Sequence, residues 1–103
     1  MTQEELKEAA KVFKALSDEN RLKILRSLWE RRESEVSVTE LVETLGISQP
    51  LVSHHLKELR YAGIVEGTRQ GAFIYYRVKS PDFIRLIECI LSTVLKGKLG
   101  NEM

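Results

Sequence analysis

The chain has 103 residues, enough for one domain with a modest core, so self-association is an expected source of further stability. Hydrophobic residues make up 43% of it and charged residues 30%, a balance typical of a folded soluble protein and not of a disordered one. The formal net charge of +1 is too small to indicate nucleic-acid binding by itself. The most apolar run is too short to span a bilayer, and the first residues are unlike a secretory signal. We therefore expect a cytoplasmic protein with no membrane partner.

The charges are distributed unevenly along the chain. Residues 1–47 hold 8 basic and 10 acidic residues, a net charge of −2, whereas residues 48–79 hold 5 and 2, a net charge of +3. The remaining segment holds 3 of each sign. The basic part is therefore the central third, which a homodimer would present twice.

Helical signals dominate the first 46 residues. Apolar residues recur at three- and four-residue spacing between residues 6 and 16, which predicts an amphipathic first helix. A second helix is predicted to begin with Ser17 as its N-cap, because Asp18 and Glu19 then lie at the positive end of its dipole. A third is predicted to begin at Ser37 and to end at Gly46.

The next helix follows almost at once. Ser48 is predicted to be its N-cap, with Pro50 in the first turn. Because so few residues separate this start from the end of the third helix, the two helices are predicted to form a helix-turn-helix.

The pattern then changes to β-branched and aromatic residues on both sides of Gln70 and Gly71, which predicts a two-stranded hairpin. Arg69 lies near its tip and Arg77 on its return strand. We expect the aromatic side chains of this region to pack the hairpin against a helix and not to stack on bases. They are Tyr61, Phe73, Tyr75 and Tyr76.

Ser80, Pro81 and Asp82 are predicted to open a last, strongly apolar helix. This order of elements predicts an α+β fold, mostly α: a winged helix-turn-helix with a two-stranded β-hairpin wing and terminal dimerisation helices. We expect this domain, with its DNA-binding and dimerisation parts, to cover residues 1–96, and residues 97–103 to form a short flexible tail.

Three segments carry a family resemblance: "ALSDENRLKILRSL", "VTELVETLGISQPLVSHHLKELRYAGIV" and "RQGAFIYYRV". They resemble successive signatures of the ArsR/SmtB family of bacterial and archaeal winged-helix repressors, and the resemblance extends over roughly residues 6–95. It implies a homodimeric repressor that binds an inverted-repeat operator in double-stranded DNA and leaves it when an inducer, commonly a metal ion, binds. The sequence does not identify the operator or the inducer.

Two adjacent histidines lie in the fourth helix, in a chain that has no other. His54 falls on the polar face and is predicted to contact DNA, whereas His55 falls beside the apolar face and is predicted to pack or to brace the helix. Because neighbouring residues of a helix point about 100° apart, one metal ion cannot easily bind both.

Glutamine and serine can bond base edges, and lysine and arginine suit phosphates, so the exposed side chains of this helix and the hairpin are predicted to form the DNA interface. The predicted DNA-binding residues are Ser48, Gln49, Pro50, Ser53, His54, Lys57, Arg60, Arg69, Gln70 and Arg77.

The first and last helices carry more apolar residues than a chain of this length can bury, which predicts a homodimer interface. The predicted interface residues are Leu6, Phe13, Phe83, Ile87, Ile90, Leu91 and Val94.

The ligands of the family's familiar metal sites are missing. Where the resemblance implies a Cys-x-Cys pair, the stretch "EVSVTEL" has Ser37 and Thr39, whose hydroxyls are poor ligands for thiophilic ions. The last helix offers Asp82, Glu88 and Cys89 but no histidine. We therefore predict no metal site and no cofactor.

Other hypotheses remain open. Cys89 is the only cysteine, and it is either an inert apolar group or an intersubunit contact of a redox-responsive repressor. A winged helix that binds only proteins is another alternative, although the retained polar and basic residues favour DNA. We expect no enzyme activity, because the sequence has no nucleophile with a base and an orienting group, no glycine-rich phosphate loop and no suitable carboxylate pair.

Overall fold

The computed structural model describes the backbone of residues 1–102 and the side chains of residues 1–97. Its elements are α1 (Gln3–Leu16), α2 (Glu19–Glu30), β1 (Val36–Ser37), α3 (Val38–Leu45), α4 (Gln49–Tyr61), β2 (Val65–Gln70), β3 (Phe73–Val78) and α5 (Pro81–Glu102).

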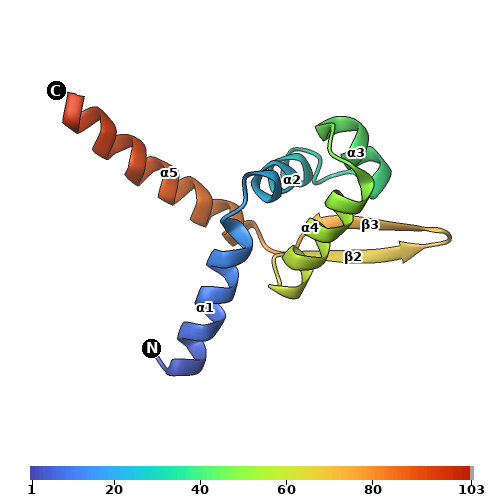
Figure 1. Ribbon diagram of the computed structural model, residues 1–103, viewed down its shortest axis with the longest axis horizontal. Coiled ribbons are helices and arrows are strands. Elements are labelled where there is room, and N and C mark those ends of the chain that lie inside the picture. The colour runs from blue at the N-terminus through green and yellow to red at the C-terminus, as the bar shows by residue number, and fades with distance from the viewer. Residues whose placement is uncertain (103) are drawn as a thin grey trace.

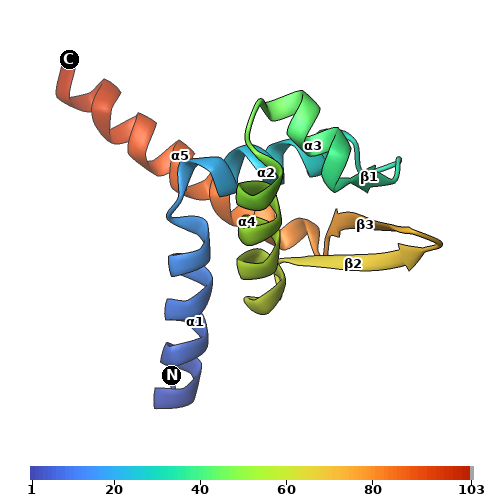
Figure 2. The same ribbon diagram turned by 45° about the vertical axis from the view of Figure 1, so that its right-hand side comes forward.

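Helices α2, α3 and α4 and the base of the sheet form the body of the molecule, and the hairpin, α1 and α5 project from it (Figure 1). The hairpin of β2 and β3 extends to one side, and α5 extends to the other. Helix α1 runs alongside α4, as the turned view also shows (Figure 2). The predicted winged helix-turn-helix is confirmed in this arrangement, with α3 and α4 as its two helices.

The wing is part of a three-stranded antiparallel sheet of order β1-β3-β2. Strand β1 pairs Val36 with Tyr76 and Ser37 with Tyr75, and it was not predicted. Two residues are too short to show an alternating pattern, and Ser37 also caps the following helix. The sequence therefore predicted the two hairpin strands correctly but missed the third.

Local capping fixes the ends of the recognition unit as predicted. The Ser37 side chain accepts a hydrogen bond from the backbone N–H of Glu40, and α3 ends at Gly46, whose φ of 66° favours glycine. The Ser48 hydroxyl accepts a hydrogen bond from the backbone N–H of Leu51 at 3.4 Å. Because both caps are made by nearby residues, the sequence alone was enough to locate them.

The start of α2 was predicted one residue too early. Asp18 is the N-cap, and its Oδ1 accepts a hydrogen bond from the backbone N–H of Arg21 at 3.2 Å. Ser17 instead ends α1, where its hydroxyl donates to the Lys14 carbonyl at 2.8 Å. Aspartate and serine are about equally good N-caps, so composition did not decide between neighbours.

Every element of the body contributes to one core. The side chains that are almost fully buried are Ile24, Leu25, Leu28, Val36, Leu41, Val52, Leu56, Leu59, Ile64 and Val65. Three of them come from α4, so the inner face of this helix is held by the core and its outer face has a defined direction.

Helix α5 continues to Glu102, through most of the segment that we expected to be a flexible tail. The side chains of residues 98–103 lie outside the described residues, so the domain boundary at residue 96 and the tail remain predictions. In the described part of the chain, no helix is both long and apolar enough to cross a membrane.

Candidate nucleic-acid interface

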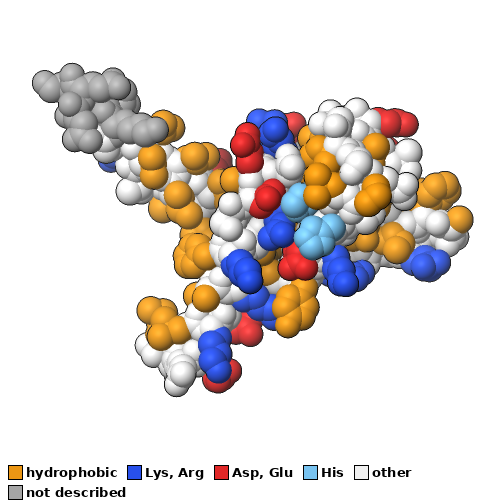
Figure 3. All heavy atoms as spheres, in the orientation of Figure 1, with side chains coloured by type: hydrophobic (Ala, Val, Ile, Leu, Met, Phe, Trp, Pro, Cys, Tyr) orange, Lys and Arg blue, Asp and Glu red, His pale blue; other side chains and the backbone are white. Residues whose placement is uncertain are grey.

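The buried and the exposed side chains of α4 lie on different faces of the helix, as its periodicity predicted. Val52, His55, Leu56 and Leu59 are buried. The predicted DNA-binding residues of this segment are all exposed: Ser48, Gln49, Pro50, Ser53, His54, Lys57 and Arg60. Figure 3 shows histidine colour on the surface near several Lys and Arg side chains, and of the two histidines only His54 is exposed. The structure thus brings these seven residues together on one helix and its N-cap.

His55 braces this helix from the inside, as expected. It is only 4% exposed, and its Nδ1 accepts a hydrogen bond from Nε of Arg21 on α2 at 3.0 Å. Because Nδ1 is the acceptor, the neutral ring must carry its proton on Nε2. Nε2 lies 3.8 Å from Oδ1 of Asp18, too far for a hydrogen bond, and it has no hydrogen-bond partner among the described residues.

Burial and these neighbours change the pKa values of His55 and Asp18. Burial lowers the pKa of His55 below 6.5, and the nearby Asp18 carboxylate only partly offsets this effect. For Asp18, desolvation by itself would raise the pKa, but the hydrogen bond from the Arg21 backbone lowers it below 3.8, together with the charge that His55 carries once it is protonated at low pH. At neutral pH the structure therefore holds a neutral histidine beside a charged aspartate.

Arg69 is exposed near the tip of the wing. Residues directly opposite in an antiparallel pair share one face of the sheet, and Arg69 is opposite Ile74. Two residues along β2, Gly67 is opposite Tyr76, and two further, the buried Val65 is opposite Val78. Arg69 therefore lies on the same face of β2 as the buried Val65, at the opposite end of the strand.

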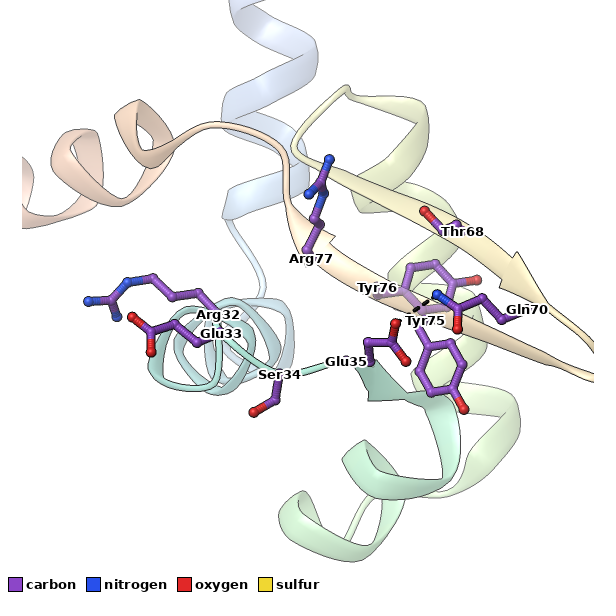
Figure 4. Close-up of a pocket in the computed structure, with 9 residues that line it drawn as sticks. All are labelled: Arg32, Glu33, Ser34, Glu35, Thr68, Gln70, Tyr75, Tyr76 and Arg77. Carbon is purple, nitrogen blue, oxygen red and sulfur yellow. Dashed lines mark hydrogen bonds between the residues drawn. The ribbon is translucent and has the colours of Figure 1, made fainter.

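Gln70 and Arg77 lie on the other face of these strands. They line a hollow of about 320 Å³ between the wing and the loop after α2 (Figure 4). Gln70 Nε2 donates a hydrogen bond to Oε1 of Glu35 at 2.7 Å, and Arg77 Nε pairs with Glu66. The structure thus does not bring these two side chains together with α4, and their contact with DNA remains a prediction.

The aromatic side chains were only partly predicted. Tyr76 packs against the core, but Tyr61 is 73% exposed and Phe73 is 56% exposed. The prediction that Tyr61 and Phe73 pack the hairpin against a helix was therefore wrong. Tyr61 instead contacts α1, where Lys11 Nζ lies 4.0 Å from the centre of its ring. This contact joins residues fifty positions apart, and no local pattern indicates it.

The apolar residues predicted for the homodimer interface fall into two groups. Phe83 and Ile87 are partly buried and pack against the core of this chain. The others are exposed, and Leu95, which was not among the predicted interface residues, is exposed beside them. The exposed residues are Leu6, Phe13, Ile90, Leu91, Val94 and Leu95.

The candidate metal ligands remain apart. The Ser37 hydroxyl caps α3, Thr39 is exposed on that helix, and Cys89 is exposed on α5. Within the described residues, no three histidine, cysteine, aspartate or glutamate side chains form a group that could hold a metal ion. The absence of metal sensing and the role of Cys89 remain predictions.

Comparison with known proteins places the chain in a family. The model of a family described as "Bacterial regulatory protein, arsR family" matches residues 18–67. The arsenic resistance transcriptional regulator ArsR1 of Pseudomonas putida is 39% identical over 84 residues, which are 82% of this chain and 63% of that protein. The transcriptional repressor SdpR of Bacillus subtilis is 36% identical over 86 residues, which are 84% of this chain and 92% of that protein. This chain belongs to the ArsR family.

These matches confirm the resemblance found in the sequence, and a solved structure has the same fold. The homodimeric winged helix-turn-helix DNA-binding domain of a possible ArsR-family regulator from Mycobacterium bovis is similar with a TM-score of 0.74. It is 31% identical, and the match covers 86% of this chain and 80% of that one. The chain spans 63% and 62% of the lengths of the first curated relatives it matches.

Proposed function

We propose that this ArsR-family chain is a homodimeric transcriptional repressor that binds an inverted-repeat operator through α4 and the wing. The observation that carries the proposal is the exposed polar face of α4, in a helix whose inner face is fixed in the core. A helix-turn-helix reads DNA by placing the N-terminal part of its second helix in the major groove.

The side chains of α4 divide by the contacts that they suit. Ser53 and His54 are near the middle of the exposed face and can bond base edges, with Gln49 at the mouth of the groove. Lys57 and Arg60 follow toward the C-terminal end, where cationic side chains suit phosphates. In the wing, Arg69 is the exposed cation that the structure supports best as a further phosphate contact.

A homodimer would present this surface twice. The exposed apolar side chains of α1 and α5, among them Phe13 and Leu91, support an interface between two copies of the chain. Two recognition helices about 34 Å apart would then read half-sites one turn of DNA apart.

Selection from a pool of random-sequence DNA duplexes tests the proposal. After repeated rounds of binding to the purified chain, the retained duplexes should share an inverted repeat whose half-sites are centred about 10 base pairs apart. A reporter gene with this repeat over its promoter should be repressed by the chain. A pool that retains no common sequence would contradict the proposal and favour a protein-binding winged helix.

A further inference from the structure

Helix α1 carries a row of lysines apart from its apolar face. Lys7, Lys11 and Lys14 are four and three residues apart, so their side chains fall within an arc of about 60° at 100° per residue. Leu6 and Phe13, the exposed apolar residues of the same helix, point roughly 120° away. The lysine row therefore lies outside the face of α1 that is predicted for dimerisation.

This row forms one wall of a groove between α1 and α4. A hollow of about 390 Å³ lies between the two helices, with the three lysines on one side and Glu58 and Tyr61 on the other. Lys11 on one wall contacts the Tyr61 ring on the other.

The groove continues into the proposed DNA surface. A second hollow, of about 380 Å³, shares Glu58 and Tyr61 with the first and is also lined by Lys57 and Arg60. Figure 3 shows Lys and Arg side chains over both α1 and α4, on the face where histidine colour is visible. The lysine row and the exposed face of α4 thus form one cationic surface.

The charges in the first hollow favour an anion. Four cationic side chains line it against two acidic ones, Glu8 and Glu58. One of the four, Arg21, is engaged with His55 and, at 3.4 Å, with the Ala15 carbonyl. Lys7 pairs with Glu4 at 3.6 Å, but both side chains are exposed, so this pair is weak.

We propose that this α1–α4 groove binds the sugar-phosphate backbone of the same DNA duplex that α4 reads, an inference that rests on the proposed function. Along α4, Arg60 lies about 10 Å beyond Ser53 at 1.5 Å per residue. The major groove is about 12 Å wide, so a helix that reads bases at Ser53 brings its C-terminal end to the phosphates at the groove edge. The lysines of α1 extend the cationic surface from that edge along the strand.

A matched pair of double variants tests this inference. Lys7→Gln/Lys14→Gln removes two charges from the groove and leaves the Lys11–Tyr61 contact intact. Lys23→Gln/Arg26→Gln removes two charges from α2, where Lys23 also forms an exposed pair with a glutamate, Glu19, at 3.8 Å. Thermal melting and sedimentation are compared first, so that both variants are measured as folded proteins in the same state of association.

The readout is the dependence of DNA affinity on salt, measured on a selected duplex and on a scrambled one. Each lysine that meets a phosphate contributes about 0.9 to the slope of log affinity against log salt, so the groove variant should lose up to about 3.6 per dimer on both duplexes. The α2 variant should keep the slope of the unmodified chain. Glu58→Gln, which removes a negative charge from the groove, should raise affinity for both duplexes.

Two failures can be told apart. If the unmodified chain selects no duplex, the proposed function and this inference both fail. If it binds a selected duplex and the groove variant keeps the same salt slope as the α2 variant, only the groove inference is overturned.

Discussion

At the scale of single residues, the two adjacent histidines show how one step along a helix changes a side chain's role. The rings of His54 and His55 are 5.7 Å apart between centroids, yet one is exposed and the other is buried beside α2. The step of about 100° per residue is the cause. The exposed ring is available to a base, and the buried one holds the helix to Arg21.

The buried histidine should make stability depend on pH. Because the pKa of His55 is below 6.5 in the folded chain, the unfolded chain binds more protons as the pH falls below 6.5. The stabilisation by the neutral ring is therefore complete above about pH 6.5 and is lost as the pH falls through the folded pKa. Asp18, with a pKa below 3.8, loses its contribution only at lower pH.

Thermal melting between pH 8 and pH 5 measures this effect. The unmodified chain should lose more of its Tm across this range than His55→Gln, whose side chain can still accept a hydrogen bond from Arg21. His54→Gln is the matched control and should follow the unmodified chain. If His55→Gln has the same pH dependence as the unmodified chain, the buried ring is not the source.

At the scale of elements, the sequence predicted those helix ends that are determined by residues close together in the chain. The caps at Ser37 and Ser48 and the stop at Gly46 depend on residues only a few positions away, and all three were correct. Strand β1 could not be predicted, because it exists only through pairing with β3, some forty residues further on. Its two residues carry no pattern of their own.

The candidate site follows the same division. The exposed face of α4 was predictable, because helical periodicity alone separates it from the core. The contacts of the wing were less predictable, because Gln70 donates a hydrogen bond to Glu35, which lies 35 residues earlier in the chain. The bond between Arg21 and His55 spans 34 residues and was likewise invisible in the sequence.

The wing also predicts the effect of one small substitution. A Cβ added at Gly67 would lie 3.0 Å from Cε1 of Tyr76 and 3.1 Å from Cγ2 of Ile74 on the neighbouring strand. We expect Gly67→Ala to reduce the free energy of unfolding by about 1–3 kcal/mol, because both side chains must move. Urea unfolding measures the change.

Gly97→Ala is the control, because among the described residues its added Cβ has no neighbour within 4 Å apart from the adjoining residues and the backbone of its own helix. Alanine also favours a helix interior over glycine by up to about 1 kcal/mol, so this variant should be neutral or more stable. Equal effects of the two substitutions would show that the close approach to Tyr76 is unimportant.

At the scale of the whole molecule, the terminal helices determine what the chain can associate with. Their exposed side chains, including Phe13, Ile90 and Val94, form an apolar surface on elements that project from the body. Burial of such a surface between two copies gives the homodimer that the proposed function requires.

Sedimentation equilibrium at micromolar concentration should therefore give the mass of a dimer. Leu91→Glu should give a monomer, because a buried carboxylate without a partner is costly in an apolar interface. Leu91→Met keeps the apolar area and should remain a dimer. A monomer mass for the unmodified chain would contradict the proposed interface.

The central claim is that α4 reads bases while cationic side chains hold phosphates, and one titration tests it most directly. Affinities of His54→Ala and Arg69→Ala are measured on a selected duplex and on a scrambled one at several salt concentrations. His54→Ala should lose about 1–3 kcal/mol of binding to the selected duplex and little to the scrambled one. Arg69→Ala should weaken both together and reduce the salt slope. A His54→Ala variant that binds the selected duplex as tightly as the unmodified chain would contradict the claim.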